Sequence, residues 1–216
     1  MSKRALIRLS GVACIVAGVC LAAFVLVHPW DRLVGAANAR TARWQLAHTL
    51  HFVGALFALF GLIGIYAHER DSVGRFGLLG FVVSFIGNAM FLGTGMITAF
   101  IWPMLAVYAP ATVELGGALF GMPRSALAFG LTAVTVSVGY VLLGIATLRA
   151  RVYPAPATVM LVIGAVLGML PPHPVGLLPW AALVFGGVLY GLALIWFGVV
   201  LAGSGDPVPR RVMPRL

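Results

Sequence analysis

The amino-acid sequence predicts an all-α protein, a polytopic bundle of about six transmembrane helices. Three observations support this fold class. Hydrophobic residues make up 62% of the 216 residues and charged residues only 9%, and the mean hydropathy is +1.07. The apolar residues are gathered into runs of roughly 20, the length that crosses a bilayer as a helix. Soluble domains carry about a quarter charged residues, so a soluble fold could not cover this much apolar surface.

Six apolar segments are expected to cross the membrane, and together they form one integral membrane domain, residues 1–216. They cover approximately residues 5–27, 46–67, 76–101, 125–148, 152–170 and 175–201. The fifth is the shortest: its core from Ala155 to Leu170 reaches only ~24 Å at the helical rise, so it needs Val152 and Tyr153 to complete a crossing. The run Pro171-Pro172-His173-Pro174 cannot continue a helix and separates the fifth segment from the sixth.

The Lys and Arg residues predict the orientation, because loops rich in these residues stay in the cytoplasm. With a cytoplasmic N-terminus, ten of the 14 Lys and Arg residues fall on the inner side and four on the outer side. The inner residues are Lys3, Arg4, Arg8, Arg70, Arg75, Arg149, Arg151, Arg210, Arg211 and Arg215, and the outer ones are Arg32, Arg40, Arg43 and Arg124. The sequence therefore predicts a multi-pass protein of a bacterial plasma membrane with both termini in the cytoplasm.

Two segments allow two interpretations each. The first apolar run could be a cleaved signal peptide, since the A-x-A pattern Ala37-Asn38-Ala39 follows it, but its core from Leu9 to Val27 exceeds the about 7 to 15 residues of a signal. The connection from Trp102 to Arg124 is 23 residues long and partly apolar. It suits either an interfacial or re-entrant stretch or a plain loop.

Charge and motif content argue against several classes of function. The expected spans carry no charged residue at depth, which argues against an ion-driven pump, and Lys3 is the only lysine, which argues against a retinal protein. None of the hydrolase, zinc-protease, nucleotide-binding or C-x-x-C motifs occurs, so the sequence indicates no enzymatic activity. The net charge of +9 lies in short clusters between apolar runs, a pattern typical of membrane topology rather than of nucleic-acid binding. Cys14 and Cys20 lie about 9 Å apart along one helix and cannot pair.

Small residues four positions apart mark faces where membrane helices pack closely. Such residues are Ser10, Cys14, Gly18 and Ala22 in the first segment, Gly80, Ser84 and Asn88 in the third, and the pairs Gly164 with Gly168 and Gly187 with Gly191 in the last two. Asn88 lies near the middle of its segment, where an amide facing lipid would be costly, so it is expected to face the bundle. There it would hydrogen-bond to a residue of the fourth segment, or line a pocket for a substrate or a quinone. The candidate partners are Thr132, Thr135 and Ser137.

Histidines are the candidate ligands of a cofactor or a metal. In the predicted topology four of the five lie near the outer ends of helices, and His68 alone lies inside. His48 and His51 share one helix face and are the candidate cofactor ligands, for example of a haem iron. The candidate ligands of a transition metal are His28, His48, His51 and His173, with Met96, Met104, Met122 and Met169 as added soft ligands for copper. Alternatively, these histidines sit at the bilayer interface, as is expected of Trp30, Trp44, Trp102 and Trp180.

Several features of the stretch from His48 to Ile101 occur together. They are a second span that begins with a histidine, its ending Leu62-Ile63-Gly64-Ile65-Tyr66, a short charged turn with Gly74-Arg75, a glycine-rich third span and, farther on, Arg149 and Arg151 before the fifth span. In these features the chain resembles small six-span membrane proteins, mostly uncharacterised, from actinobacteria and Chloroflexi-like bacteria. The resemblance implies a six-span fold and assigns no activity to any residue.

Three functions agree with these observations. The sequence favours a non-catalytic subunit or scaffold of a membrane complex, because its helices carry small-residue contact faces and no deep charge. The alternatives are a redox subunit that binds haem or quinone at the outer side, and a small-solute transporter. The expected partners are the lipid bilayer and either other membrane proteins or further copies of the chain; nucleic acid is not expected.

Overall fold

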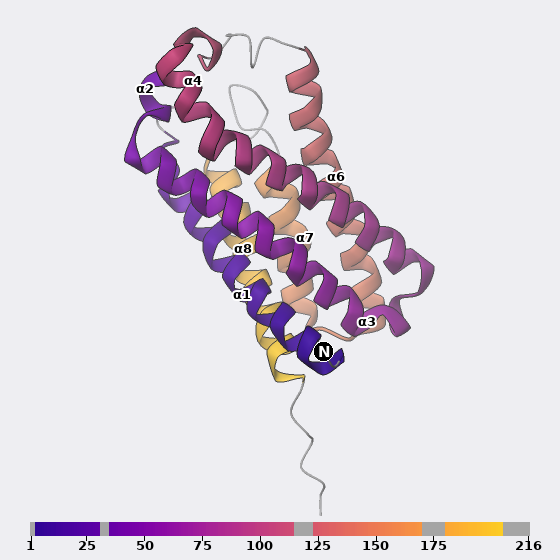
Figure 1. Cartoon of the computed structure of the whole chain (residues 1–216). Helices are drawn as coiled ribbons and strands as arrows, with labels where there is room; N and C mark the ends of the chain where they lie inside the picture. The colour runs from indigo at the N-terminus through magenta and orange to yellow at the C-terminus, as the bar shows by residue number, and fades with distance from the viewer. Residues whose placement is uncertain (1–2, 31–34, 115–122, 170–179, 205–216) are drawn as a thin grey trace, which may run out of the picture.

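The computed structural model describes residues 3–30, 35–114, 123–169 and 180–204, and within these ranges every regular element is helical. The long helices are α1 (Lys3–Val27), α3 (Ala42–Met96), α6 (Pro123–Ala150), α7 (Ala155–Met169) and α8 (Trp180–Gly203). The short elements are α2 (Ala36–Ala39), a π-helical turn (Ile97–Ile101), α4 (Trp102–Tyr108) and a 3-10 turn (Pro110–Thr112). The structure therefore confirms the predicted all-α helix bundle (Figure 1).

The helix α3 is a hairpin of two antiparallel arms, residues 42–73 and 75–96. They meet at Gly74, whose φ of 59° and ψ of −159° are non-helical. A side chain at such a positive φ would be strained, so glycine suits this turn. The arms lie side by side, because the rings of Tyr66 and Phe81 stack at 4.5 Å and those of Phe52 and Phe100 meet edge to face at 5.3 Å. The first arm continues as a helix to the turn, so its predicted end at residue 67 was too early.

Within the described residues, a closed ring around the core is formed by six helical segments, namely α1, the two arms of α3, α6, α7 and α8. The first arm of α3 packs on α1, α1 packs on α8, α8 on α7, α7 on α6, and α6 on the second arm of α3. The start of α1 lies beside the end of α8, where Gly11 faces Gly198 and Ala202. We call this end of the bundle the terminal end. The opposite end, which carries α2 and α4, is called the cap end (Figure 1).

The expected small-residue faces are helix contacts, and the stripe on α1 serves two neighbours. Ser10 and Cys14 face Gly64 and Gly61 of the first arm. Gly18 and Ala22 instead face Gly191 of α8. Gly164 and Gly168 of α7 face the backbone of α8, whereas Gly187 of α8 faces Val25 of α1. The stripe of the second arm faces α6, where Gly80 meets Leu143 and Ser84 meets Gly139. Small residues let the backbones approach closely, which is what holds helices together in lipid.

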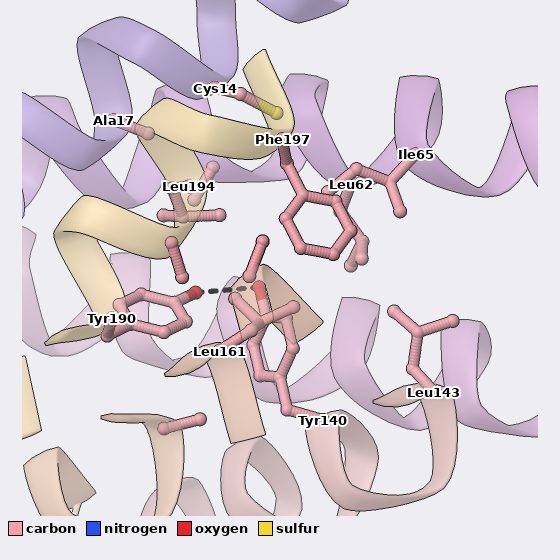
Figure 2. Packing of buried hydrophobic residues seen from close by; sticks show 14 of the residues in the cluster. Cys14, Ala17, Leu62, Ile65, Tyr140, Leu143, Leu161, Tyr190, Leu194 and Phe197 are labelled. Atoms are coloured by element: carbon pink, nitrogen blue, oxygen red, sulfur yellow. Dashed lines mark hydrogen bonds between the residues drawn. The ribbon is translucent and has the colours of Figure 1, made fainter. Parts of the chain in front are cut away.

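Apolar side chains fill the centre of the ring and also cover its outside. The core includes Leu62 of the first arm of α3, Leu143 of α6, Leu161 of α7, and Leu194 and Phe197 of α8 (Figure 2). Large apolar residues such as Leu9, Phe60, Leu79, Val134 and Val199 are exposed on the outside. Such a surface is unfavourable in water and suits lipid.

Among the described residues, four helical stretches are long and apolar enough to cross a membrane: Arg4–Val27, Ala42–Tyr108, Pro123–Ala150 and Trp180–Gly203. The second of these contains both arms of α3, and α7 is a shorter apolar helix of 15 residues. Each of the six predicted segments thus corresponds to a helix or to an arm. The apolar helices indicate a membrane protein.

Candidate functional site

Three histidines lie together inside the cap end of the bundle. His28, His48 and His51 are 6%, 5% and 4% exposed. The ring centroids of His28 and His48 are 5.1 Å apart, and those of His48 and His51 are 6.2 Å apart. We call this group the histidine cluster. These three side chains thus lie buried inside the bundle rather than exposed at its rim, and His173 lies outside the described residues.

The local sequence explains how the cluster forms. Pro29 stops α1, so His28 is the last residue whose N–H bonds back into that helix, to the Phe24 carbonyl at 2.9 Å. Arg43 then caps the end of α1 by donating from Nε to the Val27 carbonyl at 2.7 Å. These contacts bring the end of α1 against the first turns of α3, where His48 and His51 lie three residues apart on one face.

Aromatic rings enclose the histidine cluster. The Phe24 ring lies between 4.8 and 5.6 Å from all three imidazoles. His28 lies 4.0 Å from Trp30, and His48 lies 4.1 Å from Trp44, measured between ring centroids. His51 lies 4.1 Å from Phe91 of the second arm. The imidazole rings are therefore surrounded by the flat, largely apolar rings of phenylalanine and tryptophan side chains.

The cap end closes over the cluster. Trp44 is 1% exposed and stacks on Trp102 at 5.3 Å. Glu114 accepts a hydrogen bond from the Ala36 N–H at 2.9 Å, and Arg40 donates from Nε to the Ala106 carbonyl at 2.8 Å. Residues 102–114 of the 102–124 connection thus extend the second arm and are hydrogen-bonded to α2 and its C-cap residue. Residues 115–122 lie outside the described part.

The described contacts leave much of the cluster's hydrogen-bonding capacity unused. Both ring nitrogens of His48, both of His51 and Nδ1 of His28 are buried and make no hydrogen bond of good geometry with any residue in the described ranges, while the Phe91 backbone approaches the His51 ring. Burial, and secondarily the charge of Arg43, lowers the pKa of His28 to about 4, so this imidazole is neutral at pH 7. A neutral imidazole offers one donor and one acceptor. Buried polar atoms without partners are rare and call for a ligand or ordered water.

The geometry does not favour direct coordination of a metal or a haem. Among the described residues, no group of three or more His, Cys, Asp and Glu is placed to hold a metal ion. Met96 and Met104 are about half exposed on the outside, and Met122 lies outside the described part. Two axial imidazoles of one haem have ring centroids ~6.4 Å apart on opposite faces of the macrocycle, for metal–nitrogen bonds of ~2 Å. The ring centroids of His28 and His48 are closer together than this distance. His48 and His51 project from one face of a single helix, so they do not approach a haem from opposite faces.

A second polar layer lies in the middle of the core. The Tyr190 hydroxyl donates to the Tyr140 hydroxyl at 2.6 Å (Figure 2). Asn88 Nδ2 donates to the Tyr140 oxygen at 3.1 Å. Asn88 is 1% exposed, so the prediction that it faces the bundle is confirmed. Its expected threonine and serine partners were wrong, because the tyrosines reach the centre of the ring and the shorter side chains do not. Tyrosines deep within apolar segments were the available signal, since a buried hydroxyl needs a partner.

A third polar layer, at the terminal end, was missed. Glu69 is 0% exposed and accepts a hydrogen bond from the Thr147 hydroxyl at 3.0 Å. An acidic side chain is therefore buried inside the bundle, near its terminal end. Glu69 was assigned to a charged turn, but the helix continues past it and places it on the buried face with Leu62, Ile65 and Val73. That spacing of three or four residues was the signal in the sequence.

Comparison with known proteins adds no relative to this description. No protein-family model, no curated protein and no solved structure matches the chain.

Proposed function

We propose that the protein is a multi-pass subunit of a bacterial plasma-membrane complex that binds a quinone at the histidine cluster. The observation that carries this proposal is the set of five buried imidazole nitrogens without hydrogen-bond partners among the described residues. Membrane redox subunits that bind haem or quinone were one of the functions expected from the sequence, and the ring geometry above favours the quinone.

The chemistry of the cluster matches a quinone. A quinone has two carbonyl oxygens that accept hydrogen bonds, and its reduced form has two hydroxyl groups that donate them. Neutral imidazoles serve both forms, because each has one N–H donor and one nitrogen acceptor. The planar head group suits the aromatic walls formed by Phe24, Trp44 and Phe91. An apolar site with a few convergent polar groups is the usual form of a small-molecule site.

Tryptophan fluorescence offers a direct test, because Trp30 and Trp44 lie beside the cluster and quinones quench indole fluorescence. We expect a short-chain ubiquinone or menadione to quench the detergent-solubilised protein in a saturable way. His48→Phe keeps a ring of similar size and removes both nitrogens, so it should raise the Kd at least about tenfold, the value of one lost buried hydrogen bond. His51→Phe should act in the same direction.

The matched control is His68→Phe, because His68 lies at the opposite end of the bundle, in edge-to-face contact with Tyr153. Its quenching curve should match that of the parent. Non-saturable quenching, or equal quenching curves for the His48 and His68 variants, contradicts the proposal. The functions that then remain are the non-catalytic scaffold and the small-solute transporter. A haem absorption band that disappears with His48→Phe would assign the cluster to haem instead.

The proposed orientation places the cap end outside and both termini in the cytoplasm. The basic asymmetry of the sequence supports it, as does the position of the first turns of α1 beside the last turns of α8. The arginines of the first outer loop, the exception to that asymmetry, have structural roles in part. Arg40 and Arg43 bind the last carbonyls of α4 and α1. Such contacts hold arginines at helix ends whatever the side of the membrane.

Reporter fusions test this orientation. Green fluorescent protein joined after Leu216 should fluoresce, and alkaline phosphatase at the same position should be inactive. As a control, phosphatase joined after Val113, at the cap end, should be active. Active phosphatase at Leu216 contradicts the proposed topology.

A further inference from the structure

The terminal end of the core contains a carboxyl group that the proposed function does not use. Glu69 of the first arm is fully buried. Its Oε1 accepts the Thr147 hydroxyl of α6 at 3.0 Å, and its Oε2 makes no hydrogen bond within the described part of the chain. The carboxyl group therefore has one buried oxygen without a hydrogen-bond partner among the described residues.

No described cation neutralises this carboxyl group. Arg70, the next residue, pairs with Asp71 at 3.3 Å, and both side chains are well exposed. Arg149 of α6 lies over the Phe76 ring at 5.7 Å. The remaining arginines of this end that the structure describes are exposed: Arg4 and Arg8 on α1, Arg75 just after the turn of α3, and Arg151 in the α6–α7 connection.

Two other titratable side chains lie near Glu69. Tyr153, from the α6–α7 connection, donates its hydroxyl to the Ile65 carbonyl at 3.4 Å, one helical turn before Glu69. His68 contacts the Tyr153 ring at 5.5 Å between centroids and is half-buried. The Cys14 thiol of α1 lies farther along the core, against Gly61 of the first arm. Among the described residues, the group bonded to the carboxyl is thus a neutral hydroxyl, and no lysine or arginine is paired with it.

From this arrangement we propose that Glu69 is a proton-binding site of the membrane core, which takes up and releases a proton from the aqueous phase at the terminal end. A buried carboxylate without a paired cation is costly, whereas the neutral acid meets no such penalty. An ionisable group placed in this way inside membrane helices is typical of a functional proton site. Exchange with water has a short route, because the adjacent Arg70 is 57% exposed and the turn at Gly74 follows within five residues.

Dicyclohexylcarbodiimide provides the test, because this apolar reagent reacts with protonated carboxyl groups inside membranes. The carboxyl oxygen bonds to the central carbon of the reagent while the acid proton moves to one of its nitrogens, and an acyl shift then gives a stable adduct. With the full chain in lipid nanodiscs at pH 6, we expect peptide mass mapping to place the adduct on Glu69. The labelling rate should fall at least tenfold as the pH is raised to 9.

Two variants and one control sharpen this test. Glu69→Gln should remove the adduct, whereas Glu114→Gln, which changes an exposed acid at the cap end, should leave it unchanged. Thr147→Val removes a hydrogen bond that favours the charged form, so the pH dependence of labelling should move to higher pH. Mapping on the parent protein decides the matter even if Glu69→Gln does not fold.

Three results overturn the proposal. They are an adduct that maps elsewhere, a labelling rate at Glu69 that does not change with pH, and protection of Glu69 by Na⁺ at constant pH, which would assign the site to a metal cation. Failure of quinone binding leaves this test unaffected, since the two sites lie at opposite ends of the bundle.

Discussion

Gly191→Leu should prevent stable packing of α8 against α1. A Cβ atom at this position would lie 2.6 Å from the Gly18 carbonyl oxygen and 2.8 Å from the Ala22 Cβ. The first of these is backbone, which cannot move aside without separating the two helices. Overpacking typically costs about 1–3 kcal/mol, and a leucine here exceeds that range because the whole helix contact is affected. We expect the thermal unfolding midpoint in detergent to fall by about 10 °C or more.

Gly93→Leu is the matched control for this prediction. Gly93 lies in the second arm of α3, and a Cβ atom built there meets nothing within 4 Å. The same substitution in a helix should therefore change the midpoint by only a few degrees in either direction. Equal midpoints for the two variants would show that α1 and α8 are not in contact along this face.

Asn88→Asp should be the most damaging single-atom change in the core. The amide is 1% exposed, and its Nδ2 donates to the Ser84 carbonyl at 2.8 Å and to the Tyr140 hydroxyl at 3.1 Å. An aspartate replaces this donor with an oxygen that faces the Ser84 carbonyl, and it brings a charge to the centre of the bundle. A charged side chain at the middle of a membrane helix costs about 2.5–3.5 kcal/mol, so the unfolding midpoint should drop by several degrees.

Asn88→Leu separates the charge from the loss of hydrogen bonds. The Tyr140 and Tyr190 hydroxyls still bond to each other in this variant, so its destabilisation should be about 1 kcal/mol. Gln45→Glu makes the same amide-to-acid change at an exposed position and should leave the midpoint unchanged. If both Asn88 variants unfold with the parent, the central hydrogen-bond layer does not contribute to the bundle.

Most helix boundaries agree with the predicted segments to within a few residues, because apolar length and helix breakers are local properties. The first expected segment, 5–27, is α1 over Lys3–Val27, and the fourth, 125–148, is α6 over Pro123–Ala150. The second segment is the exception, because it was expected to end at residue 67 and the helix continues to Val73, whereas the third was expected to begin at residue 76, next to the start of the second arm. The polar residues from His68 to Asp71 indicated a loop, but in the structure the helix carries them to the turn at Gly74.

The candidate site was predictable only in part. The sequence predicted that His28, His48 and His51 lie at one depth in the membrane, because all three are at the ends of apolar runs. Whether their rings meet depends on which helices are neighbours. That in turn depends on small-residue contacts such as Cys14 with Gly61, whose partners a single sequence does not identify.

The sequence by itself determined that this protein is a bundle of apolar helices, where those helices begin and end, and which faces carry small residues. These properties are encoded residue by residue in hydropathy and helix propensity. Tertiary structure alone decided that three imidazoles converge under a cap, that Asn88 donates to Tyr140, and that Glu69 is buried. Each of these results depends on the rotation of one helix against another. Packing of the whole ring sets that rotation, because in lipid close contact rather than hydrophobicity selects the neighbours.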